Sequence, residues 1–181
     1  YRIEGIRLPC SFGGFEMSVR AIIGQQITVK AANTLAGRLA QRFGIPCDTP
    51  FEGLDTVFPD PSAFASDEAV EAMGELGIIK RRAQAIRLLA EGFADGSLEW
   101  GAGCDAQQSL QKLVALPGIG PWTANYLLMR AFHYTDGFPA ADYGVKLGFP
   151  GLTPKEIERL SEAWSPYRSY AVMSLWCAPH D

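Results

Sequence analysis

The chain has 181 residues, of which 48% are hydrophobic and 20% are charged, and its formal net charge at pH 7 is −4. A chain of this size and hydrophobicity buries a substantial core, in one large domain or in two closely packed lobes, so it needs no metal or disulfide to fold. The negative net charge argues against a protein that holds nucleic acid through a broad basic face. Any contact with DNA must therefore be local.

The spacing of the cysteines bears on whether the chain holds a metal cofactor, and the hydropathy pattern bears on its location in the cell. Cys10, Cys47, Cys104 and Cys177 lie far apart and form no C-x-x-C pair, so we expect reduced thiols and no iron–sulfur cluster. No stretch has the length of a membrane span, and the first residues lack the layout of a signal peptide. We therefore expect an intracellular protein, cytoplasmic if it is bacterial, that has no membrane partner and is a monomer. Because the chain begins at Tyr1, a further upstream domain stays open.

Helical periodicity runs through nearly the whole chain. Apolar residues recur three and four apart, and helix-start signals stand at Asp105 with Gln108 and at Thr153-Pro154-Lys155-Glu156. The segment 46–61, rich in Pro, Gly and Asp, is expected to be a connection, and the only strand-like pattern is a short one at the extreme N-terminus. We therefore predict an all-α fold of eight to ten helices. The predicted helices cover residues 15–23, 31–43, 66–76, 83–93, 105–115, 121–132, 143–148, 153–164 and 168–177.

The most informative segment is LPGIGPWTAN, residues 116–125, which lies between two predicted helices. Gly118 and Gly120 permit a tight turn and lack the Cβ that would keep a partner at a distance. Pro121 suits the first turn of the following helix, whose N-terminal amides carry the positive end of the helix dipole. Such a turn is an anion site, and a phosphate diester is its natural ligand. The glycine spacing alone fits a plain helical turn equally well.

With this run the chain resembles the helix-hairpin-helix (HhH-GPD) DNA glycosylase superfamily, to which endonuclease III belongs, and within it the DNA-3-methyladenine glycosylase II family. The resemblance implies one catalytic region over residues 1–181, folded as two packed helical lobes with the active site in the cleft between them. It implies no cofactor for the chemistry, but a structural monovalent cation at the hairpin. The implied phosphate-binding residues are Gly118, Ile119, Gly120 and Thr123. The implied cation ligands are the backbone carbonyls of Val114, Leu116 and Ile119.

The resemblance also implies a catalytic carboxylate. The superfamily places an aspartate in a Gly/Pro loop after the hairpin, and GFPAAD, residues 137–142, fits that pattern with Asp142. A carboxylate beside C1′ stabilises an oxocarbenium-like sugar and orients or deprotonates the attacking water. Asp142 also fits the N-cap of the predicted helix 143–148, and the two roles are compatible. Bifunctional relatives place a nucleophilic lysine where this chain has Trp122, so the resemblance implies hydrolysis by water without a lyase step.

Three aromatic residues and a glutamine complete the implied site. Trp122 and Tyr126 are four residues apart and share a helix face, while Trp176 lies on the last predicted helix. Each alone fits a core position, but together they match the base pocket of the DNA-3-methyladenine glycosylase II family, whose electron-rich walls attract a cationic base. Gln26 matches the residue that is inserted into the DNA stack, in the corner Gly24-Gln25-Gln26, where we expect both amide side chains at the tip.

Three features depart from that family. Its bacterial member has an N-terminal accessory domain that this chain lacks. Gln26 stands where that enzyme inserts an apolar wedge, and Ala141 replaces an acidic neighbour of the catalytic residue. These departures bear on DNA affinity and on how the duplex is opened, whereas Asp142 and the aromatic residues keep the chemistry.

The sequence therefore predicts a monofunctional DNA glycosylase of base excision repair, which flips alkylated bases such as 3-methyladenine out of double-stranded DNA and hydrolyses the N-glycosidic bond. A glycosylase for oxidised or mismatched bases stays open, and it would read a neutral base through hydrogen-bonding groups such as Tyr126 and Asn125. A non-catalytic helix-hairpin-helix DNA-binding module would need neither Asp142 nor the aromatic pocket. A purely structural helical domain would make all these features a coincidence.

Overall fold

The computed structural model describes residues 4–99 and 104–178. The chain divides into two compact units. The internal unit consists of Phe15–Glu99 and Ala115–Ile119. The terminal unit consists of Tyr1–Gly14, Trp100–Val114 and Gly120–Asp181. Among the described residues helices dominate both units, which confirms the predicted all-α class.

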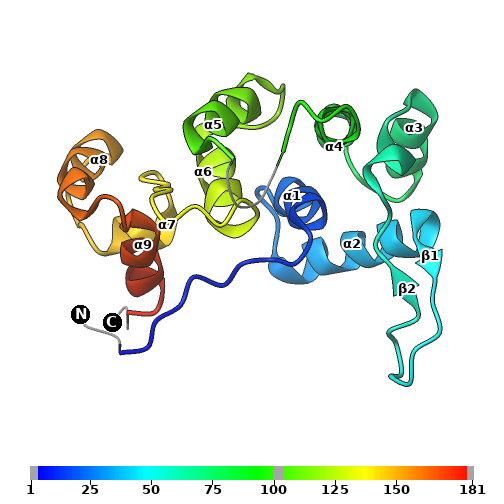
Figure 1. The fold of residues 1–181 in the computed structure, drawn as a ribbon, viewed down its shortest axis with the longest axis horizontal. Coiled ribbons are helices and arrows are strands. Elements are labelled where there is room, and N and C mark those ends of the chain that lie inside the picture. The colour runs from blue at the N-terminus through cyan, green and yellow to red at the C-terminus, as the bar shows by residue number, and fades with distance from the viewer. Residues whose placement is uncertain (1–3, 100–103, 179–181) are drawn as a thin grey trace. The chain divides into compact units, whose positions relative to one another are not determined.

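The internal unit is built on four α-helices and one short hairpin (Figure 1). The strands β1 and β2 pair antiparallel, Ile45 with Val57 and Pro46 with Thr56. The prediction of a strand-free connection was wrong here, because strands of two residues are too short to show an alternating pattern. The elements are α1 (Gly14–Ile23), α2 (Val29–Phe43), β1 (Ile45–Pro46), β2 (Thr56–Val57), the 3₁₀ helix η1 (Pro61–Phe64), α3 (Asp67–Glu75) and α4 (Lys80–Ala94).

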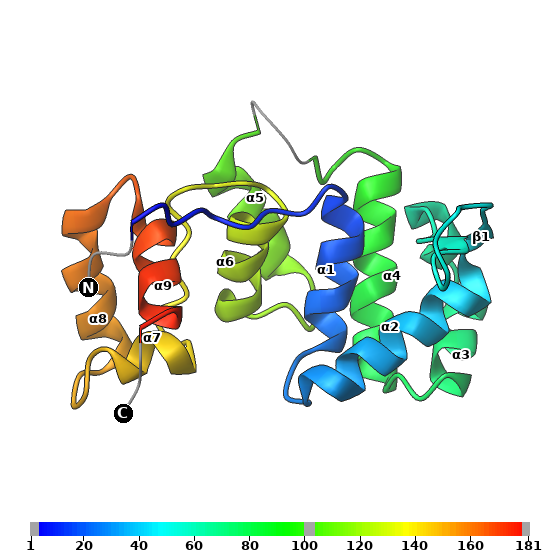
Figure 2. The same ribbon diagram turned by 90° about the horizontal axis from the view of Figure 1, so that it is seen from below.

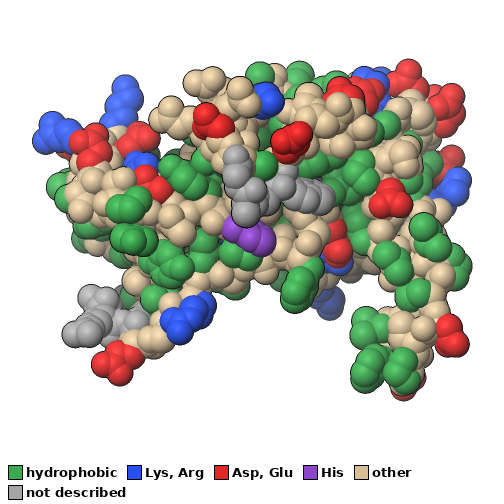
Figure 3. All heavy atoms as spheres, in the orientation of Figure 1, with side chains coloured by type: hydrophobic (Ala, Val, Ile, Leu, Met, Phe, Trp, Pro, Cys, Tyr) green, Lys and Arg blue, Asp and Glu red, His purple; other side chains and the backbone are tan. Residues whose placement is uncertain are grey.

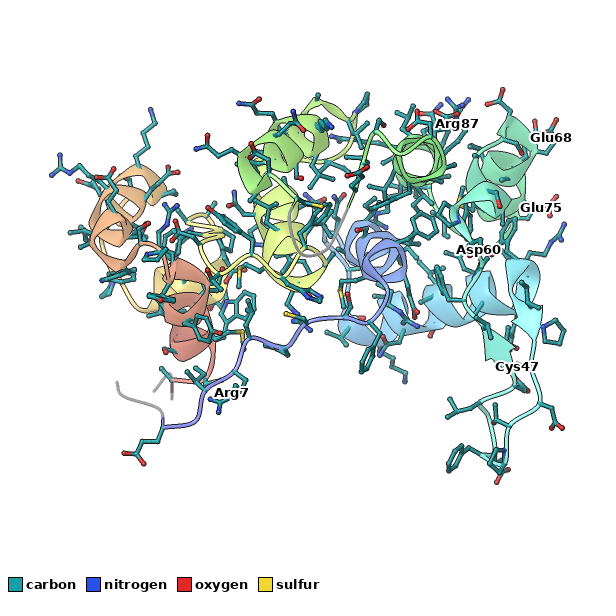
Figure 4. All side chains as sticks on the ribbon, viewed as in Figure 1. Arg7, Cys47, Asp60, Glu68, Glu75 and Arg87 are labelled. Carbon is teal, nitrogen blue, oxygen red and sulfur yellow. The ribbon has the colours of Figure 1, made fainter. Side chains whose placement is uncertain are left out.

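The core of the internal unit confirms most of the predicted apolar stripes. Helices α1 and α4 lie side by side in both ribbon views (Figures 1 and 2). Phe15 on α1 contacts Phe93 on α4 and Phe64 on η1, with ring centroids 5.6 and 5.7 Å apart. Arg87 extends from α4 on the side of α3 and binds Glu91 (Figure 4). The fully buried aliphatic residues of this core include Val19, Ile22, Ile23, Leu39, Ile86 and Leu89.

Apolar side chains also gather on the surface of the hairpin that contains β1 and β2 (Figure 3). Phe51 and Leu54 at its turn are 66% and 62% exposed. No helix within the described residues is long and apolar enough to cross a membrane.

In the described residues of the terminal unit every regular element is a helix, and its start signals act as predicted. Thr153 and Glu156 form a reciprocal capping box at α8, with Pro154 in the first turn. The carboxylate of Asp105 accepts hydrogen bonds from the backbone N–H groups of Gln107 and Gln108 at the start of α5. The elements are α5 (Ala106–Ala115), α6 (Pro121–Arg130), α7 (Tyr143–Leu147), α8 (Pro154–Ser161), the 3₁₀ helix η2 (Glu162–Trp164) and α9 (Arg168–Trp176).

One apolar cluster joins the helices of the terminal unit. It is formed by Met129 on α6, Val145 on α7, Ile157 on α8 and Val172 on α9, with Phe138 from the loop between α6 and α7. Each of these side chains is at most 5% exposed, and burial of a side chain of this size contributes about 1.5–3 kcal/mol. The cluster therefore fixes α7 and α9 relative to α6.

An ion pair between the buried carboxylate of Asp136 and the partly buried guanidinium of Arg168 fastens the loop after α6 to the start of α9. The guanidinium of Arg168 donates from Nε to Oδ1 of Asp136 at 2.7 Å and from Nη2 to Oδ2 at 2.8 Å. Ser165 and the backbone N–H of Arg168 donate to the same carboxylate. Burial raises the pKa of Asp136, but the hydrogen bonds from Arg168 and Ser165 outweigh this effect and hold the pKa below its ordinary value. The pair thus favours the folded state wherever Asp136 is ionised.

We expect Asp136→Asn to lower the free energy of unfolding by about 3 kcal/mol at pH 7, because it leaves Arg168 without its carboxylate. Since the folded-state pKa of Asp136 is lowered, its contribution is complete above the ordinary aspartate pKa of about 4 and is lost as the pH falls through the folded-state value. Urea unfolding at pH 7, 5 and 3 should therefore show a parent–variant difference that is constant from 7 to 5 and smaller at 3. Asp60→Asn, at an exposed aspartate, is the control; a difference independent of pH would contradict this account.

Candidate active site

Asp142 is the N-cap of α7, as predicted. Its backbone is extended, with φ −62° and ψ 141°, and its Oδ1 accepts a hydrogen bond from the backbone N–H of Val145 at 3.2 Å. Its own backbone N–H donates to the carbonyl of Pro139 at 2.8 Å, which closes the preceding turn. The backbone of Asp142 is therefore fixed to the preceding turn and its carboxylate to the start of α7. The residue is half-buried.

Two indole rings bind the same carboxylate from different helices. Nε1 of Trp122 on α6 donates to Oδ2 at 2.8 Å, and Nε1 of Trp176 on α9 donates to Oδ1 at 2.7 Å. Each carboxylate oxygen has about two acceptor positions. The two donors on Oδ1, from Trp176 and Val145, fill both of its positions. Oδ2 accepts only from Trp122 among the described contacts, so its second position is the one that is open to a further donor.

The three predicted pocket aromatics lie together beside Asp142. The rings of Trp122 and Tyr126 are stacked with centroids 5.3 Å apart and planes 14° apart. The ring of Tyr126 also contacts Trp176 at 6.3 Å, with the planes tilted by 41°. All three residues are half-buried, so part of each ring faces outward. Because Trp122 and Tyr126 touch, a flat ligand would stack on their outer surfaces, not between them.

Arg130 belongs to this cluster, although sequence reasoning missed it. Its guanidinium lies over the Tyr126 ring, 5.6 Å from the centroid, and its Nη1 lies 3.4 Å from the phenol oxygen. The signal was present in the sequence, because Tyr126 and Arg130 are four apart on one helix and therefore share a face. The contact places a positive charge beside the ring of Tyr126. Along α6, Arg130 follows Tyr126 by four residues, and Trp122 precedes it by four.

Asn125, a candidate for reading a neutral base, is occupied in holding the site together. Its Nδ2 donates to the carbonyl of Pro121 at 3.0 Å, and its Oδ1 accepts from the backbone N–H of Phe138 at 3.1 Å. The second candidate, the hydroxyl of Tyr126, contacts Arg130. The side chain of Asn125 therefore links α6 to the loop that carries Asp142, which uses one of its two N–H donors and one of its two acceptor positions.

The two hairpin glycines differ in their surroundings. Gly118 has a φ of +94°, and a Cβ there would lie 3.0 Å from the Cβ of Ala85 on α4, so the packing of the internal unit itself requires a glycine. Gly120 has a φ of −88°, which any residue adopts, and a Cβ there would meet no atom within 4 Å. The other two predicted phosphate-binding residues, Ile119 and Thr123, are each only 4% exposed. Of the four, Gly120 is exposed and Gly118 partly so.

The predicted corner between α1 and α2 has its two glutamines in different places. Gln26 is exposed and has a φ of +56°, which is uncommon for a residue other than glycine. The Gln25 side chain instead donates to the carbonyl of Gly118 at 3.1 Å, and the Gln25 carbonyl accepts from Arg82 on α4. The expectation that both amides lie at the tip was therefore wrong, because the carbonyl of Gly118 provides an acceptor for one of them. Of the two glutamines, Gln26 alone is exposed.

The predicted cation ligands lie where a helix ends. Val114 is in the last turn of α5, whose final carbonyls have no donor within the helix. The carbonyl of Leu116 accepts the backbone N–H of Ile119 at 3.1 Å, which uses one of its two acceptor positions. Carbonyl oxygens with a position left are the ligand type that a hard cation takes.

The comparisons with known proteins agree with this fold and show its family. Residues 19–166 match the family model of the HhH-GPD superfamily base excision DNA repair proteins, and the chain belongs to that family. It is 40% identical over 172 residues to DNA-3-methyladenine glycosylase 2 of Escherichia coli, covering 95% of this chain and 60% of that protein. It is 39% identical over 180 residues to a probable bifunctional transcriptional activator/DNA repair enzyme of Mycobacterium tuberculosis, covering 97% of this chain and 35% of that one.

A comparison with solved structures also finds a glycosylase of the same fold. The 3-methyladenine DNA-glycosylase of Archaeoglobus fulgidus superposes with a TM-score of 0.73 and 27% sequence identity, covering 93% of this chain and 59% of that one. The chain thus spans less than two thirds of the length of these relatives.

The surroundings of the two glycines predict unequal effects on stability. We expect Gly118→Ala to lower the free energy of unfolding by about 1–3 kcal/mol, because it strains a left-handed turn and presses on Ala85. Gly120→Ala should change it by less than about 0.5 kcal/mol, since the new methyl group enters open space. Urea denaturation of the two variants beside the parent measures both values. Equal destabilisation would show that the hairpin does not pack as described.

Proposed function

We propose that this chain is a monofunctional DNA glycosylase of base excision repair that hydrolyses the N-glycosidic bond of alkylated bases such as 3-methyladenine. The observation that supports this most is the carboxylate of Asp142, held between the indoles of Trp122 and Trp176 beside a cluster of aromatic rings. Relatives named 3-methyladenine glycosylases support the substrate class.

In the proposed reaction the C1′–N bond breaks and the sugar develops an oxocarbenium-like positive charge, which the negative carboxylate of Asp142 stabilises. A water molecule attacks C1′ and forms the new C–O bond. Its proton passes to the open acceptor position on Oδ2 and from there to solvent. The products are the free base and an abasic sugar with a hydroxyl group at C1′.

The aromatic cluster suits a cationic leaving group. An alkylated purine that carries a positive charge departs as a neutral molecule, so no second acid is needed to protonate it. Its charge also attracts the faces of Trp122 and Trp176, each contact contributing about 0.5–2 kcal/mol. Two groups that would read a neutral base, the side chains of Asn125 and Tyr126, already have partners within the protein. Fewer of their hydrogen-bonding positions are then left to read a neutral base, which supports alkylated bases as the substrate class.

The absence of a lyase step rests on Trp122. Strand cleavage by a glycosylase needs an amine that forms a Schiff base with C1′, and an indole nitrogen cannot act as that nucleophile. The Trp122 nitrogen also donates its hydrogen to Asp142. Water is therefore the proposed nucleophile, and the DNA strand stays intact after the base is released.

We propose that the chain, as a monomer, binds damaged double-stranded DNA through local contacts. Gly120 and the exposed start of α6 are the phosphate site, because this helix end has no side-chain hydrogen bond at its N-cap and carries the positive end of the helix dipole. Gln26 is the residue that enters the stack when the base leaves it, since it alone of the two corner glutamines is exposed. A monovalent cation held by the carbonyls of Val114, Leu116 and Ile119 would steady the hairpin without taking part in the reaction. With this activity we propose an intracellular protein that acts on chromosomal DNA.

Release of free base from methylated duplex DNA tests the function directly. We expect the purified chain to release methylated purines, and the DNA to break at the resulting sites only after heat or alkali. Separating the released bases by chromatography and the DNA on a denaturing gel measures both steps. Binding of DNA without any release would instead support the non-catalytic module, and breaks without heat or alkali would contradict the monofunctional mechanism.

Asp142→Asn tests the catalytic carboxylate. Asparagine is also a good N-cap, so α7 should remain folded, but the amide carries no negative charge for the sugar cation. We expect the excision rate to fall roughly a hundredfold or more while DNA affinity stays within about twofold. Asp105→Asn makes the same change at the N-cap of α5 and should leave excision unaltered. Full activity of Asp142→Asn would remove Asp142 from the mechanism.

Gly120→Ala tests the phosphate site. A methyl group at this exposed position keeps a phosphate away from the amides at the start of α6, so we expect DNA affinity to fall about tenfold, the value of one hydrogen bond to a charged group. Gly74→Ala on α3, where a Cβ also meets no atom within 4 Å, is the matched control. Fluorescence anisotropy with a labelled duplex measures both; equal affinities of the two variants would exclude the hairpin as the binding site.

A further inference from the structure

Gly144, the second residue of α7, lies where Trp176 approaches Asp142. A methyl group on its Cα would lie 2.7 Å from Cδ1 and 3.1 Å from Nε1 of the Trp176 indole, and 3.3 Å from Oδ1 of Asp142. Carbon atoms in contact are normally about 3.5–4 Å apart. Any side chain at this position would therefore overlap the indole at the very edge that donates to Asp142.

The backbone of Gly144 does not explain the glycine. Its φ lies outside the left-handed range, and the residue is inside a regular helix. Glycine is less favourable in a helix than alanine, and at this second position of α7 the cost is at most the roughly 0.5–1 kcal/mol of a helix interior. Gly144 thus makes α7 less stable than alanine would. Its missing side chain leaves the space that the Trp176 ring occupies.

The overlap could not be relieved by a small side-chain movement. The atoms concerned belong to a rigid ring, and its Nε1 is fixed by the 2.7 Å hydrogen bond to Oδ1. Helices α7 and α9 lie side by side in both ribbon views and share the apolar cluster around Val145 and Val172 (Figures 1 and 2). A side chain at position 144 must therefore displace the indole or separate the two helices.

We infer that Gly144 is a positioning residue: its missing side chain lets Trp176 bind Oδ1 of Asp142 and so leaves Oδ2 as the reacting oxygen. With Trp176 and Val145 both on Oδ1, this oxygen has no position left for water. Without Trp176, the carboxylate keeps two of its three hydrogen bonds and either oxygen can face the substrate. The catalytic part of this inference rests on the proposed function, whereas the contact of Gly144 with Trp176 does not.

The contact is tested by NMR spectroscopy of the indole N–H groups, which needs no activity. The chain has four tryptophans, and Trp176→Ala identifies the Trp176 signal by its disappearance. We expect Gly144→Ala to move this signal to the chemical shift of a weaker hydrogen bond. Gly148→Ala is the matched control, because its methyl group would press on Leu175 of α9, 2.5 Å away, and not on the indole. It should leave the Trp176 signal in place.

A double-mutant cycle covers the case in which Gly144→Ala folds poorly. In the parent background we expect it to lower the melting temperature. In the Trp176→Ala background, where the ring is gone, it should leave the melting temperature unchanged or raise it, because alanine favours the helix. The same loss in both backgrounds would show that the glycine does not serve Trp176, and would overturn the inference.

The effect on catalysis is measured as the single-turnover rate of base release from methylated DNA. We expect Gly144→Ala to reduce this rate about tenfold in the parent background and less than twofold in the Trp176→Ala background. A displaced Trp176 signal with an unchanged rate would overturn the positioning role. If the parent releases no base, the proposed function fails, while the NMR signals and melting temperatures still decide whether Gly144 places Trp176.

Discussion

The carboxylate of Asp142 accepts three hydrogen bonds, and the donors come from three different helices of the terminal unit. Trp122 lies on α6, Val145 on α7 and Trp176 on α9. Hydrogen bonds to a charged group are stronger than neutral ones, and a half-buried carboxylate that lacked its donors would be costly. The arrangement of these helices and the orientation of the carboxylate therefore depend on each other. A group that must stabilise a short-lived positive charge benefits from being fixed beforehand, because no reorganisation is then needed during the reaction.

Residues that do not touch the carboxylate support the elements that carry it. The ion pair of Asp136 with Arg168 joins the loop before Asp142 to the start of α9, and Asn125 joins that same loop to α6. The buried Ser169 lies within hydrogen-bond distance of two carbonyls of this loop. The polar links and the apolar cluster around Val172 act at different points of the same three helices. Together they fix the loop before Asp142 and the start of α9 relative to α6. The hydrogen-bond distances at Asp142 therefore depend on the packing of the whole terminal unit.

Local signals in the sequence were sufficient for the α-helices and for most of their ends, although α4 begins at Lys80, three residues before its predicted start, and η1 was not predicted. The Thr153–Glu156 capping box and the cap at Asp142 were predictable because each involves residues three apart, and so was the shared helix face of Trp122 and Tyr126. The meeting of Asp142 with Trp176, 34 positions later, depends on the packing of α7 against α9 and has no local pattern. It was expected only through the family resemblance.

Some features could not be expected even through the resemblance. The turn of Gln25 towards Gly118 depends on an acceptor from a distant segment of the chain, and the strands at residues 45–46 and 56–57 are too short to leave a periodic pattern. Arg130 was predictable from its spacing to Tyr126, but a charge next to an apolar stripe usually belongs to the solvated face of a helix.

Three glycines near the site illustrate why residue type alone does not reveal a residue's role. Gly118 combines a left-handed backbone with close packing against Ala85, so the fold itself requires it. Gly120 has neither constraint, so its lack of a side chain is of use only to something outside the protein. Gly144 has a helical backbone but a tryptophan ring where its side chain would be. The same amino acid thus serves the turn, an external partner and a neighbouring side chain, and only the surrounding atoms distinguish the three cases. At Asp142, where Oδ1 already accepts two hydrogen bonds, the missing Cβ of Gly144 determines the position of Trp176 as much as the hydrogen bonds do.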